Sequence, residues 1–256
     1  MRGGARAWLL GTLVAAGPFL AGGYRVPPAR AAAVACSGGA ATSSAVGSPT
    51  GALAWRAGLE GRTAVFDRPG SLAPRAWVDF SQAPWLLILG AAPLPDGQCM
   101  VRVRLPWRPN NAAGWIDGRD VLLAPTPWRI VVSRSLRTLT LFDLGRRVQR
   151  VRVVVGKPST PTPTGLFAIA DAVASNPAEF VGSWVLALTA HSDVLRAFDG
   201  GDGNVAIHGR GGASLADPLG SAASHGCIRL ANDTIDALVG RIGRYELPGT
   251  PVQVLS

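Results

Sequence analysis

Few side chains in this sequence are suited to covalent chemistry, and one histidine and one cysteine among them lie close together in its last fifty residues. The chain has three histidines and three cysteines. His208 ends the apolar run 205–207, and Cys227 lies in the following segment 221–230. A thiol is mostly protonated at neutral pH and needs a nearby base or cation to become a nucleophilic thiolate. A strand that ends at His208 beside the turn carrying Cys227 supplies that base, so the pair predicts nucleophilic catalysis.

Two other uses of this histidine and cysteine are open. Such a pair is often only structural, and a zinc site also takes both residue types. The sequence contains no C-x-x-C pair and no H-E-x-x-H motif. We therefore expect no metal site, and nothing in the sequence calls for an organic cofactor.

The residues around Cys227 resemble the signature of a known family. The heptapeptide 224–230 reads SHGCIRL and is preceded by His208-Gly209. Together they resemble the signature of the L,D-transpeptidases of the YkuD type, and TPTGLF at 162–167 is similar to that family's upstream motif. The resemblance covers about residues 128–255. It implies a mainly β, YkuD-like β-sandwich that crosslinks cell-wall peptides through a cysteine thioester.

Transferred position by position, the resemblance implies a role for each matching residue. Cys227 matches the nucleophile, His208 matches the base, and His225 flanks the nucleophile as a further catalytic residue. The backbone amides of Gly226 and Cys227 match the oxyanion hole, which stabilises the negative charge that develops on the attacked carbonyl.

Three other positions match residues that hold the substrate in relatives: Ser224, Arg229 and Gly209. Some relatives carry asparagine where this chain has Arg229. Because Gly209 follows His208, any group at that position that orients the imidazole has to be a backbone carbonyl. His191 is expected either to line the donor cleft or to be an ordinary surface histidine.

The implied reaction is the formation of 3→3 crosslinks in peptidoglycan. The partners are peptidoglycan stem peptides, one acting as donor and one as acceptor. Two alternatives stay open at this stage. An L,D-carboxypeptidase would share every motif residue and resolve the thioester with water, and a non-catalytic wall-binding protein would use only the β domain that precedes the motif.

Residues 1–35 are predicted to be a secretory signal peptide. Arg2 and Arg6 precede the uncharged stretch 7–24, and small residues lead to an Ala-Val-Ala site before Cys36. A basic start, an apolar middle and an A-x-A site are typical of export signals. An uncleaved anchor and a lipoprotein signal modified at Cys36 are the alternatives. Export predicts a protein in the cell wall or at the outer face of the cytoplasmic membrane.

Export also bears on the other cysteines, because cysteines outside the cytoplasm tend to pair and an odd one stays reactive. Cys36 and Cys99 are candidate partners, unless Cys36 is lipidated or removed with the leader. Without residues 1–35 the net charge falls from +9 to +5. The arginines of the remaining chain are scattered and are not clustered with aromatic residues, so nucleic acid is not an expected partner. Membrane contact is expected only through the leader or a lipid on Cys36.

Two β domains are predicted after the leader. Apolar residues make up 48% of the chain and charged residues 16%, which excludes a disordered polymer. Gly, Ala, Ser and Thr dominate residues 36–59 and predict a flexible linker. Residues 60–124 contain about five short strand patterns. Within them, VFDRPG at 65–70 followed by GWI at 114–116 resembles a small bacterial SH3-like barrel, with a plain β spacer as the alternative. We expect this domain to place the enzyme on the wall.

The catalytic domain is predicted at 128–256. Strand patterns at 129–133, 138–142 and 148–155 are joined by tight turns, and prolines impose an extended segment at 157–165. Near the end, apolar residues recur at helical spacing and predict one short amphipathic helix. They are Ile235, Leu238, Val239 and Ile242.

Overall fold

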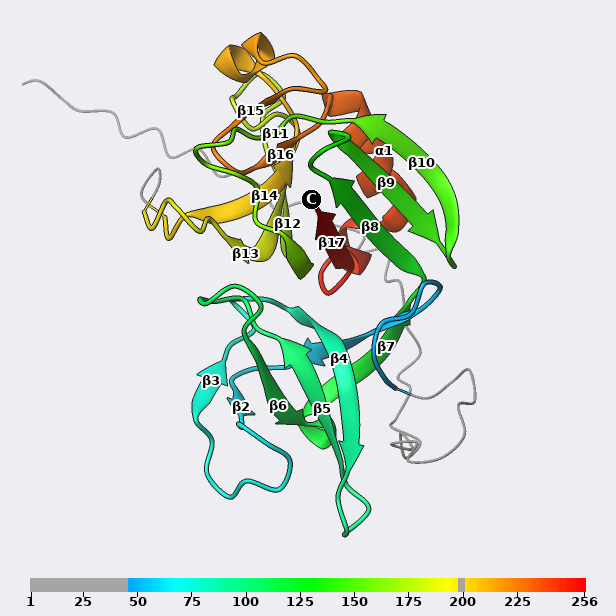
Figure 1. The fold of residues 1–256 in the computed structure, drawn as a ribbon. Coiled ribbons are helices and arrows are strands. Elements are labelled where there is room, and N and C mark those ends of the chain that lie inside the picture. Colours follow the sequence, from blue (N-terminus) through cyan, green and yellow to red (C-terminus); the bar gives the residue numbers. More distant parts are fainter. Residues whose placement is uncertain (1–45, 198–200) are drawn as a thin grey trace, which may run out of the picture. The chain divides into compact units, whose positions relative to one another are not determined.

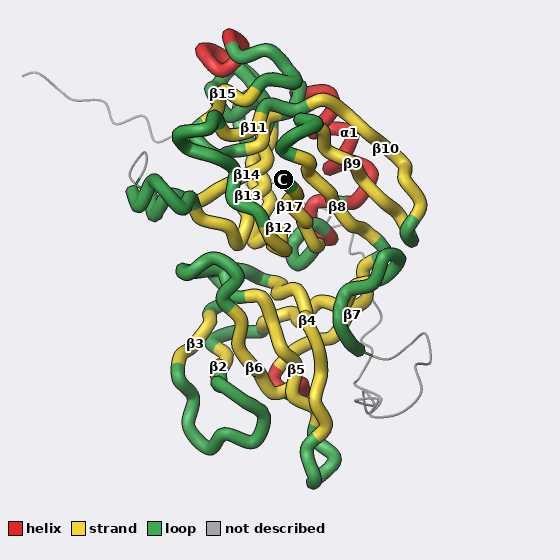
Figure 2. Tube along the Cα trace, in the orientation of Figure 1, coloured by secondary structure: helices red, strands yellow, loops and turns green. Residues whose placement is uncertain are grey.

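The computed structural model describes residues 46–197 and 201–256. The predicted signal peptide and Cys36 lie outside these residues. The described residues belong to one compact unit of the chain. Strands dominate it, with one α-helix and a few short 3-10 turns in the part described (Figures 1 and 2). The expectation of a mainly β protein is therefore confirmed.

The first part is a five-stranded antiparallel sheet ordered β6-β5-β4-β1-β7. Val101 and Val103 are fully buried on β5, and Arg102 between them is exposed, as expected for alternating side chains, but Arg104 is buried as well. The bounds are β1 (Ala54–Leu59), β4 (Trp85–Pro93), β5 (Cys99–Arg104), β6 (Ala113–Asp117) and β7 (Val121–Thr126), with β2 (Thr63–Val65) and β3 (Ala76–Val78) paired separately and a 3-10 turn at η1 (Gly118–Asp120). The SH3-like assignment of this domain stays a prediction.

The predicted linker 36–59 is wrong for its last residues, which form β1. This strand pairs with both β4 and β7 and is almost wholly buried. Its small residues have a packing role, because a Cβ at Gly58 would lie 2.8 Å from the ring of Trp85. Small side chains that suggested flexibility in the sequence instead let an aromatic ring pack against the strand.

The catalytic part is an eight-stranded sheet ordered β10-β9-β8-β17-β12-β13-β14-β16 (Figure 1). The bounds are β8 (Trp128–Ser133), β9 (Thr138–Asp143), β10 (Arg146–Arg152), β12 (Gly165–Ala174), β13 (Trp184–His191), β14 (Asn204–His208), β16 (Ile228–Arg229) and β17 (Pro251–Leu255), with β11 (Val155–Gly156) and β15 (Ala222–Ser224) paired in parallel beside it. Strand β17 comes last in the sequence and lies inside the sheet, parallel to β8 and antiparallel to β12.

Two predicted features of this domain are confirmed in detail. The turn before β10 has φ values of 45° at Leu144 and 78° at Gly145, so glycine occupies a left-handed position there. Helix α1 (Asn232–Ile242) buries the four residues that were predicted to form its apolar face. None of the helices in the described part of the chain is long and apolar enough to cross a membrane.

The predicted strand 148–155 is interrupted, and the interruption matters for the site. Strand β10 ends at Arg152, after which Val154 bridges to Arg229 and Val155 pairs with Ala222. The chain leaves its hairpin partner β9 because it pairs with the backbone on both sides of the Cys227 turn. The result is a direct backbone support for that turn.

The two parts of the unit are joined through a buried arginine of β1. Arg56 is 2% exposed and donates to the carbonyl of Pro248 at 3.1 Å. It also forms an ion pair with Glu246, which lies in the 3-10 turn η3 (Arg244–Glu246). Burial lowers the pKa of Arg56, and the carboxylate of Glu246 acts in the opposite direction.

Candidate active site

Parallel pairing of β14 with β16 brings the turn that carries Cys227 to the end of β14. The register places Ile207 opposite Ile228 and His208 opposite Arg229. Cys227 directly precedes β16, so the nucleophile lies one residue before the strand that pairs with the end of β14. Cys227 is the free cysteine of the described residues, and Cys99 is disulfide-bonded.

A backbone hydrogen bond to Gly209 helps to fix the orientation of the His208 ring. Nδ1 lies 2.7 Å from the carbonyl oxygen of Gly209. A carbonyl can only accept, so Nδ1 carries the proton and Nε2 is the basic nitrogen of the neutral ring. This is the orienting carbonyl that the sequence required at Gly209.

Burial keeps both reacting groups uncharged in the free site. His208 is 3% exposed, and burial lowers its pKa from 6.5 to about 4, with the hydrogen bond to Gly209 opposing and Arg229 reinforcing the shift. Burial also raises the pKa of the Cys227 thiol, against the effects of the Ala206 backbone and of Arg229. The resting pair is therefore a neutral thiol and a neutral imidazole.

Arg229 is buried within the site and not presented on its surface. It is 4% exposed, forms an ion pair with Asp217 and stacks 4.7 Å from the ring centroid of Phe180. The same Phe180 ring lies 6.3 Å from the ring of His208. The positive charge of Arg229 favours a thiolate and disfavours an imidazolium. The predicted contact of Arg229 with substrate stays a prediction.

Ser224 holds the turn that presents Cys227. Its hydroxyl donates to the carbonyl of Cys227 at 2.6 Å and accepts from the N–H of Gly226 at 3.1 Å. Ser224 is fully buried, and Gly226 has a φ of 128°, which side chains rarely tolerate. The N–H of Gly226 is thus engaged inside the turn, which leaves the Cys227 N–H as the candidate oxyanion donor. The role of Ser224 in substrate binding stays a prediction.

The upstream motif TPTG supports this same turn. The hydroxyl of Thr162 accepts from the N–H of Gly156 at 2.9 Å and donates to the carbonyl of Gly226 at 2.8 Å. One threonine side chain therefore links β11 to the nucleophile turn. This contact explains physically why two motifs that lie far apart in the sequence belong to one site.

Gly209 and Asn232 fit closely against each other behind His208. A Cβ at Gly209 would lie 2.2 Å from Oδ1 of Asn232. That oxygen accepts from the N–H groups of Ser183 at 3.2 Å and Arg210 at 2.9 Å. Gly209 therefore allows close packing that fixes the end of β14, a role distinct from its predicted contact with substrate. Sequence reasoning missed Asn232, whose only signal was its place at the start of the predicted helix.

The two remaining histidines lie in different surroundings. His225 is exposed, with Nε2 3.3 Å from Nζ of Lys157, and it lines a small cavity of about 20 Å³ together with Cys227. His191 is 4% exposed, so the alternative of a surface histidine is wrong. It does not line that cavity, and its Nε2 lies 3.6 Å from a carboxylate oxygen of Asp202. Within residues 46–197 and 201–256, no cluster of metal-ligating side chains is present.

The chain is similar to known proteins over about half of its length. The model of the YkuD family, described as the L,D-transpeptidase catalytic domain, matches residues 127–254. The YkuD protein of Bacillus licheniformis is 35% identical over 106 residues, which are 41% of this chain and 54% of that protein. The YkuD protein of Bacillus subtilis is 29% identical over 133 residues, or 50% of this chain and 71% of that protein.

A solved L,D-transpeptidase from Mycobacterium smegmatis is 17% identical, with a TM-score of 0.36, and the match covers 62% of this chain and 91% of that one. The chain spans about half the length of the Bacillus licheniformis protein. With the family's catalytic domain matched over half of its residues, the chain belongs to the YkuD family of L,D-transpeptidases.

Proposed function

We propose that this protein is a peptidoglycan L,D-transpeptidase that forms 3→3 crosslinks through a thioester on Cys227. The observation that carries the proposal is the parallel register of β14 and β16, in which His208 lies opposite Arg229, two residues after Cys227. The hydrogen bond from His208 Nδ1 to Gly209 at 2.7 Å adds to it, because it leaves Nε2 as the base.

In the first half-reaction, the Cys227 sulfur attacks the carbonyl at the L-centre of meso-diaminopimelate in a tetrapeptide stem. The thiol proton passes to Nε2 of His208 as the S–C bond forms, since neither group is charged at rest. The Cys227 N–H donates to the oxygen that becomes negative. The C–N bond to the terminal D-alanine then breaks, and its nitrogen takes the proton from His208.

In the second half-reaction, the side-chain amine of another stem attacks the thioester. Its proton passes to His208 and then to the departing sulfur, which restores the thiol and leaves an amide between the two stems. Arg229 assists both steps, because its charge stabilises the thiolate each time sulfur carries negative charge. Hydrolysis by water would follow the same route and release a tripeptide.

The test is incubation of the purified protein with a disaccharide-tetrapeptide, followed by mass spectrometry of protein and products. We expect a thioester on Cys227, free D-alanine and a crosslinked dimer, and Cys227→Ser should give none of them. Release of tripeptide with no dimer would identify a carboxypeptidase and refute transpeptidation. Absence of any adduct or product would refute both enzymes and favour the wall-binding alternative.

We further propose that the protein acts outside the cytoplasm after export. The basic start, the uncharged stretch and the Ala-Val-Ala site within residues 1–35 support this. We expect the N-terminus of the mature protein to fall between Ala32 and Cys36, as read by N-terminal sequencing of protein from the wall fraction. An intact leader on that protein would favour the anchor, and a diacylglycerol on Cys36 would show the lipoprotein route.

A further inference from the structure

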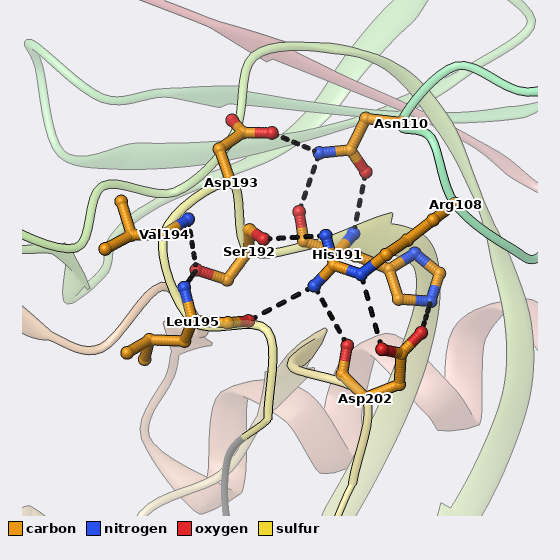
Figure 3. Close-up of polar contacts among 8 residues, drawn as sticks. All are labelled: Arg108, Asn110, His191, Ser192, Asp193, Val194, Leu195 and Asp202. Atoms are coloured by element: carbon orange, nitrogen blue, oxygen red, sulfur yellow. Dashed lines mark hydrogen bonds and ion pairs between the residues drawn. The ribbon is translucent and has the colours of Figure 1, made fainter.

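The loop between β5 and β6 (residues 105–112) binds the catalytic domain through two side chains (Figure 3). Arg108 donates from Nη1 to the carbonyl of Ser192 at 3.0 Å and from Nη2 to that of Leu195 at 3.1 Å. Asn110 donates to the carbonyl of His191 at 2.6 Å and accepts from its N–H at 2.8 Å. The loop thus acts on the backbone of the chain that follows β13.

The same arginine also binds the chain that leads into β14. Arg108 donates from Nη2 to the carbonyl of Asp202 at 3.1 Å and from Nε to its carboxylate at 3.3 Å. Figure 3 shows the guanidinium between Asp202 on one side and Ser192 and Leu195 on the other. One planar cation therefore joins two stretches of backbone that lie just beyond the last paired residues of β13 and β14.

Regular strand pairing does not hold these stretches. Strands β13 and β14 pair from Val185 to Ala187, and their register is then broken until His191 meets Asn204. Beyond that pair, the N–H of Ser192 donates to the carbonyl of Gly203 at 2.8 Å. The side chains of Arg108 and Asn110 supply backbone partners where the sheet ladder stops.

These stretches form one side of the cavity at Cys227. We call this side the pocket wall; it consists of Ser192, Leu195, Gly203, Asn204 and Val205. The cavity measures about 20 Å³, which is room for roughly one water molecule. Any shift of the pocket wall therefore changes what can lie against the sulfur of Cys227.

We propose that Arg108 and Asn110 are positioning residues for the acyl donor, acting through the pocket wall. They give the N-terminal β domain a part in donor binding, beyond the wall-targeting role expected from its sequence. The inference rests on the proposed function, since it concerns the donor that acylates Cys227. Neither residue touches Cys227 or His208, so the chemistry of the thiol is left intact when they change.

The test is the concentration dependence of Cys227 acylation by a carbapenem, whose strained ring imitates the scissile amide, in the full chain. Arg108→Ala should raise the half-saturating concentration and lower the second-order rate by about 10- to 100-fold, as expected for a misplaced binding wall. The limiting rate should change much less. The pH dependence of Cys227 alkylation by iodoacetamide should stay as in the wild type. Arg119→Ala is the matched control, because Arg119 pairs with Asp117 inside the N-terminal domain.

A second variant guards against an effect of misfolding. Asn110→Asp places a carboxylate against Asp193, whose Oδ1 now accepts from Asn110 at 2.7 Å, and should reproduce the defect. Adding Asp193→Asn to the Asn110→Asp variant should restore part of its affinity for the carbapenem, because it removes the repulsion between the two carboxylates. A half-saturating concentration equal to that of the wild type in both Arg108→Ala and Asn110→Asp would overturn the inference. So would an equal loss of carbapenem and iodoacetamide reactivity, which indicates a general loss of structure. A wild-type protein that no carbapenem acylates would instead refute the proposed function.

Discussion

The buried neutral imidazole of His208 should make folding stability depend on pH in a defined window. The pKa of His208 is about 4 in the folded protein, against an ordinary 6.5. Between these values the unfolded chain binds a proton that the folded chain does not. Stability therefore falls as pH is lowered from about 6.5 to about 4, and it is insensitive to this group above pH 7.

The size of the effect follows from the same two values. The difference between 6.5 and about 4 corresponds to about 3 kcal/mol once the pH has reached 4. About 2 kcal/mol of this is already lost at pH 5 by the same relation. This is a large share of the stability of a typical domain, which is about 5–15 kcal/mol.

The perturbation is His208→Asn, because the amide can still donate to the carbonyl of Gly209 but cannot titrate. Urea unfolding at pH 7.5, 5 and 4 measures the free energy of unfolding of both proteins. We expect the wild type to lose about 3 kcal/mol more than the variant between pH 7.5 and 4. Cys227→Ser controls for substitution in the site, since a thiol does not ionise in this range. Parallel curves for wild type and His208→Asn would refute a buried, neutral His208.

Three further pairs of substitutions test the packing around the site and between the two domains. Thr162→Val should lower the free energy of unfolding by about 1–3 kcal/mol, because it leaves the N–H of Gly156 and the carbonyl of Gly226 unpaired. Thr162→Ser should keep both hydrogen bonds, and thermal unfolding of the two variants measures the difference. Gly209→Ala should slow carbapenem acylation more than tenfold because its Cβ meets Asn232, and Asn232→Ala should recover part of the rate. Glu246→Gln should lower the free energy of urea unfolding more than Arg56→Met. Glutamine leaves a buried cation unpaired, whereas methionine leaves a carboxylate that is half in water.

Much of the fold follows from periodicity in the sequence. Helical spacing on α1 is a local pattern that survives in the structure, because one face of the helix is buried. On β5 the alternation holds only at Arg102, since Arg104 is buried. Strand β1 was missed, since Ala and Gly carry no alternating signal and the pairing with β4 and β7 depends on distant residues. The break after Arg152 was missed for the same reason.

The candidate site divides in a similar way. Cys227 and His208 were predicted because their chemistry is specific and their motif is local. The support from Thr162 could be named as a motif but not as a hydrogen bond. Arg108 and Asn110 left no signal, because an arginine and an asparagine in a loop are ordinary surface residues until the fold brings His191 and Asp202 to them.

The place of β17 inside the catalytic sheet sets an order for folding. The hairpin strands β8 to β10 and the strands β12 to β16 are joined within the sheet only through β17. Residues 251–255 emerge after the other strands of this sheet during synthesis, so the sheet itself cannot become continuous until then, although Val154 and Val155 can already pair with Arg229 and Ala222. Long-range pairings of this kind fold slowly, because the intervening chain must be ordered first.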